Sequence, residues 1–286
     1  MNKMLFRPNN LTSGAVVAIM VMGVVSLAGQ EFRAPRGPDA KPDLNGIWQA
    51  LNEANYDIEA HVARSAMALR PAPYGPVPAA AVLALGAVGA VPPSRGVVEG
   101  GEIPYKSEAL ARRQQNQQDW LKLDPEIKCY LPGVPRATYM PYPFQILQST
   151  SALTFVYEYA GAVRNVFLKD PGPAPADSWM GRSVGHWEGD TLVIDVTDLN
   201  DQTWFDRAGN FHSDKLHVVE RYTRSSPDVI SYEATIDDPN VFTRPWKISM
   251  PLYRRQERNA QLLDFKCVEF VEELLYGQYR KRPLNE

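Results

Sequence analysis

The second half of the chain is a series of short segments in which apolar and aromatic residues alternate with polar ones. Each segment is bounded by turn formers such as Glu188-Gly189-Asp190 and Asp237-Asp238-Pro239. This pattern is typical of β-strands, whose successive side chains point to opposite faces. The segments cover residues 144–147, 153–159, 163–168, 191–196, 216–222, 229–236, 246–253 and 262–268. They predict a mainly β fold, an antiparallel meander that forms a barrel or a strongly curved sheet.

Three further segments are predicted to be helices. They cover residues 55–69, 107–123 and 269–279. Apolar residues recur at helical spacing in the first, and Ser107 is placed to cap the second. We therefore expect one β domain over 44–286, with a helical and proline-rich insertion at 50–128. The last helix would cover an edge or an end of the barrel.

The amino terminus has the order of a secretory signal peptide, with basic residues before an apolar run and small residues after it. Cleavage after Ala28 fits best, which makes residues 1–28 the signal. The apolar run is shorter than the roughly 20 residues of a membrane-spanning helix, so an uncleaved anchor is the weaker alternative. Residues 29–43 are predicted to be a flexible leader. The protein is thus expected to be periplasmic or secreted, touching a membrane only through an uncleaved signal.

Composition narrows the classes of function. The 30 Lys and Arg residues nearly balance the 33 Asp and Glu residues and are dispersed, so we expect no nucleic acid partner. Cys129 and Cys267 form an even pair in an exported chain, which predicts a disulfide; two buried free thiols are the alternative. Dinucleotide, phosphate-loop and metal-ligand motifs are missing, so we expect no cofactor and no metal. Residues 181–185 match Gly-x-Ser-x-Gly, but their flanks are unlike those of a hydrolase elbow.

Strand alternation places one carboxylate among apolar residues. In the predicted strand 216–222, Glu220 shares a face with Val218 and Tyr222. If that face lines the interior, burial raises the pKa of the carboxyl group toward a value useful for proton transfer, unless the carboxylate is paired. A structural pairing with an arginine such as Arg164 is the commoner arrangement for a buried carboxylate.

The long connection over residues 200–213 holds the other candidates for catalysis. A histidine oriented by a carboxylate can serve as a general base, so we name His212 with Asp206, together with Glu220, as catalytic candidates. The alternative is a structural loop in which the Asp and Asn side chains cap turns and Trp204 covers the end of the barrel.

Aromatic side chains are numerous enough to line a cavity for an apolar or aromatic molecule. Most of them are expected to belong to the core, with a few touching the ligand. The candidates for ligand binding are Arg136, Tyr157, Arg164, Trp187 and Trp204.

Two runs of residues are distinctive: CYLPGVPR, which begins at Cys129, and GHWEGDTLVID, which begins at Gly185. With them, the chain resembles a family of exported bacterial proteins of unassigned function, over most of residues 44–275. The resemblance implies a compact β fold but no reaction. By fold analogy alone, it is similar to the lipocalin-like barrels that hold small apolar molecules.

The leading hypothesis is that the exported protein binds a small apolar or aromatic molecule in a β-barrel cavity covered by the 50–128 segment. One alternative is an acid/base enzyme without a cofactor, such as a lyase, hydratase or isomerase. Another is a structural or interaction module of the cell envelope. The sequence makes no prediction of the oligomeric state.

Overall fold

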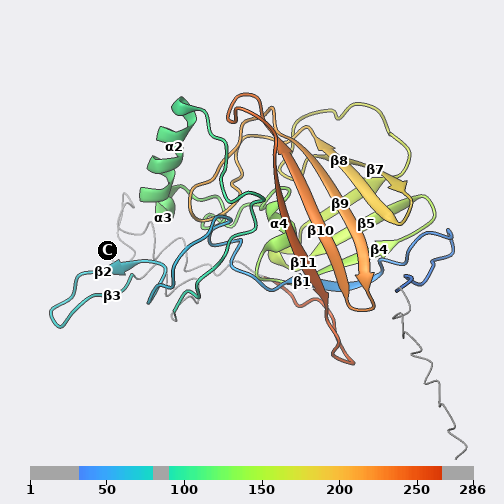
Figure 1. The fold of residues 1–286 in the computed structure, drawn as a ribbon, viewed down its shortest axis with the longest axis horizontal. Helices are drawn as coiled ribbons and strands as arrows, with labels where there is room; N and C mark the ends of the chain where they lie inside the picture. Colours follow the sequence, from blue (N-terminus) through green and yellow to red (C-terminus); the bar gives the residue numbers. More distant parts are fainter. Residues whose placement is uncertain (1–31, 80–89, 266–286) are drawn as a thin grey trace, which may run out of the picture. The chain divides into compact units, whose positions relative to one another are not determined.

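A closed barrel forms the body of the protein in a computed structural model that describes residues 32–79 and 90–265. The barrel strands are β1 (Gly46–Ala50), β4 (Phe144–Gln148), β5 (Ala152–Tyr157), β6 (Val163–Phe167), β7 (Arg182–Glu188), β8 (Thr191–Thr197), β9 (His217–Ser226), β10 (Val229–Asp237) and β11 (Trp246–Arg254). β4 to β11 follow one another around the wall, and β1 closes it between β11 and β4 (Figure 1). The predicted mainly β fold with a barrel is therefore confirmed.

One joint of the barrel differs from the predicted antiparallel meander. β6 and β7 run parallel and pair only through Val166 with Ser183 and Phe167 with Val184, whereas the other neighbours are antiparallel. A parallel pair needs a connection that returns along the barrel, and residues 168–181 provide it. Three prolines between 171 and 175 lack the N–H group that a strand pairing needs, so this stretch cannot continue as a hairpin.

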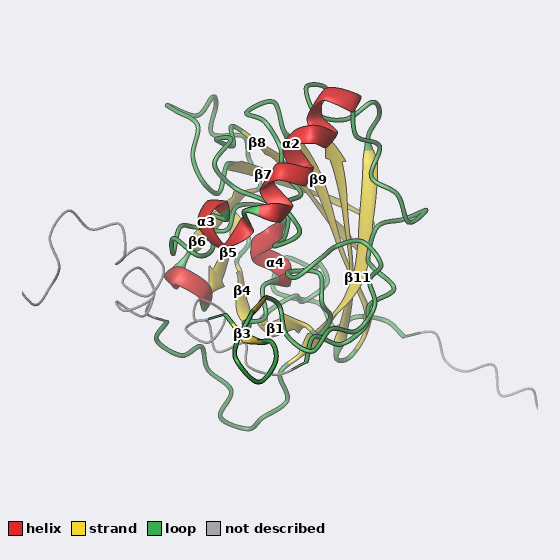
Figure 2. Ribbon diagram, turned by 90° about the vertical axis from the view of Figure 1, so that its left-hand side faces the viewer, coloured by secondary structure: helices red, strands yellow, loops and turns green. Residues whose placement is uncertain are grey.

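The short elements lie in and around the predicted insertion. They are β2 (Leu69–Arg70), β3 (Val77–Pro78), α2 (Ser107–Gln118), α3 (Trp120–Leu123), α4 (Arg136–Tyr139) and the 3-10 turn η1 (Tyr159–Gly161). Figure 2 looks onto α2, α3 and α4, with the strands behind them. α2 and α3 confirm the helix predicted over 107–123, but its N-cap is Lys106, and no side chain caps it. No helix in the described ranges is long and apolar enough to cross a membrane.

The helix predicted over residues 55–69 is wrong. This stretch forms turns and isolated bridges, with His61 opposite Ser94 and Arg64 opposite Val91. The apolar residues that suggested a helical face are not buried together, since Val62 is 74% exposed. Their spacing therefore reflects no common packing surface.

Two barrel strands, β1 and β7, were not predicted. The strand pattern of β7 is obscured by glycine and charged residues. Gly185 is needed there because a Cβ atom at this position would lie 2.8 Å from a methyl carbon of Val166. Residues 262–265 of the last predicted strand are not in a strand. The rest of that strand, the signal segment, the helix at 269–279 and Cys267 lie outside the described residues, so the disulfide stays a prediction.

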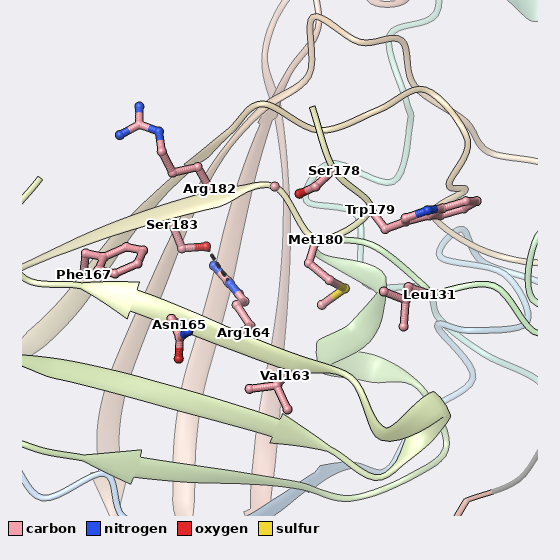
Figure 3. A pocket seen from close by; sticks show the side chains of 11 residues that line it. Leu131, Val163, Arg164, Asn165, Phe167, Ser178, Trp179, Met180, Arg182 and Ser183 are labelled. Carbon is pink, nitrogen blue, oxygen red and sulfur yellow. Dashed lines mark hydrogen bonds between the residues drawn. The ribbon is translucent and has the colours of Figure 1, made fainter. Parts of the chain in front are cut away.

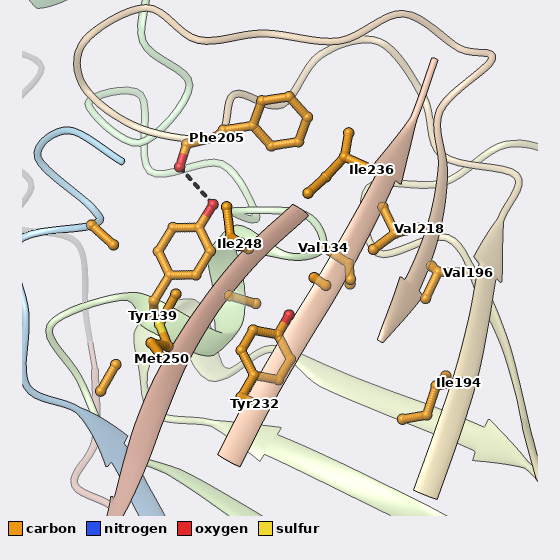
Figure 4. Packing of buried hydrophobic residues seen from close by; sticks show 14 of the residues in the cluster. Val134, Tyr139, Ile194, Val196, Phe205, Val218, Tyr232, Ile236, Ile248 and Met250 are labelled. Atoms are coloured by element: carbon orange, nitrogen blue, oxygen red, sulfur yellow. Dashed lines mark hydrogen bonds between the residues drawn. The ribbon is translucent and has the colours of Figure 1, made fainter. Parts of the chain in front are cut away.

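Inward-facing side chains pack against one another along the inside of the barrel (Figure 4). Aromatic rings contribute much of this core: the Phe155 and Tyr222 ring centres are 5.4 Å apart, and those of Tyr222 and Tyr232 are 4.9 Å apart. Tyr139 of α4 joins them and donates its hydroxyl hydrogen to the carbonyl oxygen of Phe205 at 2.9 Å. In the region where we expected a cavity, these aromatic rings contact one another.

Candidate functional site

An ion pair lies inside the barrel, where Glu220 of β9 faces Arg164 of β6. Both side chains are almost fully buried, and Arg164 Nη2 donates to Glu220 Oε2 at 2.5 Å. The other carboxylate oxygen accepts hydrogen bonds from the hydroxyl groups of Tyr222 at 3.0 Å and Tyr232 at 2.8 Å. The carboxylate is thus fully bonded, as a buried charge must be. The expected inward position of Glu220 and its pairing with Arg164 are both found.

Burial and the charge of Glu220 keep the neighbouring tyrosine hydroxyl groups protonated. Burial, reinforced by the negative charge of Glu220, raises the pKa of Tyr222 and of Tyr232 well above the ordinary tyrosine value. Burial acts to lower the pKa of Arg164, but the Glu220 carboxylate together with the hydroxyl groups of Tyr157 and Tyr222 outweighs it and raises that pKa. The phenols and the guanidinium therefore all remain hydrogen-bond donors at neutral pH.

Arg164 also bridges the joint between β6 and β7. Its side chain extends toward β7 and donates through Nε to the Ser183 hydroxyl oxygen at 2.7 Å (Figure 3). The guanidinium also interacts with the hydroxyl group of Tyr157, whose oxygen is buried beside it. Arg164 is therefore surrounded by acceptor groups of the protein itself.

A groove of about 360 Å³ opens at this joint, where β6 and β7 diverge from their two paired positions. We call it the seam groove. It is lined by Leu131, Val163, Arg164, Asn165, Phe167, Ser178, Trp179, Met180, Gly181, Arg182 and Ser183 (Figure 3). The lining includes both Val163, which is 56% exposed, and the buried Arg164 from the opposite face of the same strand. The groove therefore follows the joint between the two strands.

The structure does not join His212 and Asp206 as the predicted catalytic pair. Both oxygens of the buried Asp206 accept from other groups, namely the backbone N–H of Ile58 at 3.0 Å and the backbone and side chain of Asn210. Burial and the negative charge of Asp57 raise the pKa of Asp206 to about 7. These hydrogen bonds tie the 200–213 connection to the insertion, which is a structural role.

The histidine has a different partner that sequence reasoning missed. His212 Nδ1 lies 2.8 Å from the carbonyl oxygen of Ser213, and Nε2 lies 2.6 Å from the Thr203 hydroxyl oxygen. A carbonyl only accepts, so Nδ1 carries the hydrogen. Burial lowers the pKa of His212, so the ring is neutral and Thr203 donates to Nε2. A hydroxyl held by a neutral imidazole resembles a nucleophile and its base, but both residues are buried and neither lines the seam groove.

Arg136 belongs to a second buried ion cluster. Its three guanidinium nitrogens donate to Asn55, Asp124 and Glu126 at 2.7 to 3.0 Å. Arg207 holds the same Glu126 from the other side. Each guanidinium nitrogen is bonded to another residue of the protein. Arg136 therefore holds α4 in its orientation.

The aromatic candidates are dispersed. Tyr157 lies inside the barrel with its ring centre 5.5 Å from that of Phe144. Trp204 is buried in the 200–213 connection, where it bridges to Phe211, and Trp187 lies half-buried on β7. None of these three lines the seam groove; of the predicted ligand-binding residues, Arg164 alone does.

Leu131, Trp179 and Met180 form the apolar wall of the groove. Trp179 is one of the aromatic residues that the sequence offered for the lining of a cavity, whereas Leu131 and Met180 were missed. Within the described residues, no three side chains of His, Cys, Asp or Glu are grouped as a metal site.

Comparison with protein-family models, curated proteins and solved structures gives no match for this chain. The resemblance of its two motifs to an exported bacterial family therefore stays a prediction, and its function has to be argued from the geometry of the chain itself.

Proposed function

We propose that the protein binds a small, mainly apolar or aromatic molecule in the seam groove, and that it does so in the periplasm or outside the cell. The observation that carries the proposal is the combination of an apolar wall with an arginine, Arg164, in the lining of the same groove. Binding sites of this kind are mostly apolar, with a few polar groups that orient the ligand.

The electrostatics favour a neutral acceptor on the ligand. Glu220 already compensates the charge of Arg164 in a buried ion pair. A ligand carboxylate would add a second negative charge beside that pair, whereas a neutral carbonyl group would add none. The ligand class is therefore an aromatic or alicyclic molecule with a carbonyl group.

The experiment first identifies molecules retained by the protein from its native envelope by mass spectrometry. It then compares acetophenone with benzoate by ligand-observed NMR, and we expect the ketone to bind more tightly. The variant Val163→Asp places a charge in the groove and should weaken ketone binding about tenfold, which corresponds to roughly 1.4 kcal/mol. Leu51→Asp, at another exposed apolar residue, is the matched control. Equal affinity in the two variants would overturn the assignment of the site.

A structural role in the envelope is the second candidate, and the packed interior of the barrel favours it. It predicts no retained molecule and no difference between the two variants. The acid/base enzyme is less favoured, because His212, Asp206 and Glu220 are buried and bonded to groups of the protein itself.

A further inference from the structure

A narrow arm projects from the barrel on the side of β2 and β3 (Figure 1). We define the arm as residues 61–79 and 90–95. Its base is held by two antiparallel bridges, His61 with Ser94 and Arg64 with Val91, each with backbone hydrogen bonds of 2.7 to 3.0 Å. Its tip is the hairpin of β2 and β3, which is stiffened by four prolines between 71 and 78.

Apolar side chains of the arm point into solvent. Tyr74 at the tip is fully exposed, and Leu69 on β2 is 48% exposed. With Pro71 and Pro76, Leu69 also lines a shallow groove of about 350 Å³ along the hairpin. Apolar residues that gather on a protruding element usually mark a surface that is covered in use.

The charge of the arm has one sign. Its charged residues are Arg64, Arg70 and Arg95, and it contains no Asp or Glu, whereas the whole chain has a formal charge of −3. In the part of the chain that the structure describes, no ion pair involves any of these three arginines. By contrast, the buried Arg136 and Arg164 are paired. Arg64 interacts with Tyr56 and with the Asp57 carboxylate. Arg70 and Arg95 therefore supply the exposed positive charge of the arm.

We propose that the arm docks on the surface of a bilayer that contains anionic phospholipid. Tyr74 and Leu69 enter the interfacial region, and Arg70 on β2 contacts the phosphate groups, while Arg95 at the base of the arm adds to the attraction toward the leaflet. An aromatic residue with a polar end suits that interface, and basic side chains are attracted to an anionic leaflet.

A bilayer explains the two features together. Free phosphate would account for the arginines but would leave Tyr74 and Leu69 in water. A protein partner would need a pocket shaped for the convex tip, whereas a bilayer accepts a protrusion of any shape. The proposal is independent of the seam groove, because none of the residues lining that groove belongs to the arm.

The test is co-sedimentation of the full chain with vesicles of phosphatidylglycerol and phosphatidylcholine, compared with vesicles of phosphatidylcholine alone. We expect binding to the anionic vesicles that falls with added salt. The variant Arg70→Gln should weaken this binding by about fivefold, because a basic residue near an anionic surface contributes on that scale, and the double variant Arg70→Gln, Arg95→Gln should weaken it further. Tyr74→Ser should weaken binding to both kinds of vesicle.

Matched controls use exposed residues outside the arm. Arg258→Gln removes an exposed arginine, and Tyr253→Ser removes a tyrosine on the outer wall of β11. Neither should change sedimentation, and every variant keeps residues 1–31, so any binding through that segment is common to all. Arm variants that sediment like these controls, or a chain that does not bind the anionic vesicles, would overturn the proposal. Ketone binding in the seam groove should be unchanged in the arm variants.

Discussion

Glu220 shows how a single strand position accommodates a charge inside a barrel. The carboxylate receives one guanidinium and two phenol groups, so each oxygen is bonded. The opposite charge, on Arg164, depends on Glu220 as its one ion-pair partner among the described residues. Removing the carboxylate charge therefore leaves a buried cation without compensation.

We expect Glu220→Gln to lower the free energy of unfolding by about 3–5 kcal/mol, measured by urea denaturation, because it breaks a buried pair from one side. The control is Glu233→Gln on the neighbouring strand β10, where the side chain is 41% exposed and lies 3.4 Å from Lys247. This exposed pair should contribute less than about 1 kcal/mol. Equal effects in the two variants would mean that Arg164 is compensated by some other group.

Asp206 gives a prediction for pH dependence. Its folded-state pKa of about 7 lies above the ordinary value of 3.8, so the folded protein binds a proton more tightly than the unfolded chain. The free energy of unfolding should therefore fall as the pH rises from about 4 to about 7. Asp206→Asn should flatten this slope in unfolding experiments at several pH values, whereas Asp201→Asn, at an exposed position of the same connection, should retain it. An unchanged slope in Asp206→Asn would assign the pH dependence to other groups.

At the scale of elements, the two distinctive motifs carry glycines with different tasks. Gly133 and Gly189 both have positive φ angles, +73° and +59°. A Cβ atom at Gly133 would lie 2.5 Å from the Thr203 hydroxyl oxygen, whereas nothing lies within 4 Å of the corresponding position at Gly189. Gly133 thus lets the loop before α4 approach the 200–213 connection, and Gly189 only forms the turn between β7 and β8.

Alanine substitutions at these two glycines separate the cost of the contact from the cost of the backbone angle. Gly189→Ala should lower the free energy of unfolding by about 1–2 kcal/mol through the φ angle alone. Gly133→Ala should cost roughly 1–3 kcal/mol more, because it displaces Thr203 and breaks the hydrogen bond to His212. Thermal or urea unfolding of both variants provides the measurement, and equal losses would contradict the role of the close approach.

The joint between β6 and β7 is the element that forms the seam groove, where we propose that a ligand binds. Elsewhere the wall is built from longer antiparallel ladders, such as β9 with β10 over most of their length. The parallel joint has two paired positions and is reinforced from inside by Arg164 and Ser183. Arg164 therefore connects three features: the buried Glu220 carboxylate, the joint with the fewest paired positions in the barrel wall, and the seam groove.

For the whole molecule, the sequence predicted the features that depend on the local alternation of apolar and polar residues. β9, β10 and β11 were found because one face of each is buried, and the same alternation placed Glu220 inside the barrel. β1 and β7 and the partners of Asp206 and His212 depend on contacts between distant parts of the chain. Thr203, for example, becomes the partner of His212 only through the folding of the 200–213 connection. The seam groove could not be predicted from the sequence, because the parallel pairing of β6 and β7 depends on the topology of the whole barrel.

The position of β1 has a consequence for the order in which the protein can assemble. Trp48 is aligned with Phe144 on one side and with Arg254 on the other, so the ring closes between residues that are about 100 and 200 positions downstream. A chain emerging from a ribosome or a translocation channel exposes unpaired strand edges until its last strand has arrived. A chain that is terminated before residue 246 would consequently form an open sheet with unpaired strand edges. Such edges would pair with other copies of the chain and lead to aggregation.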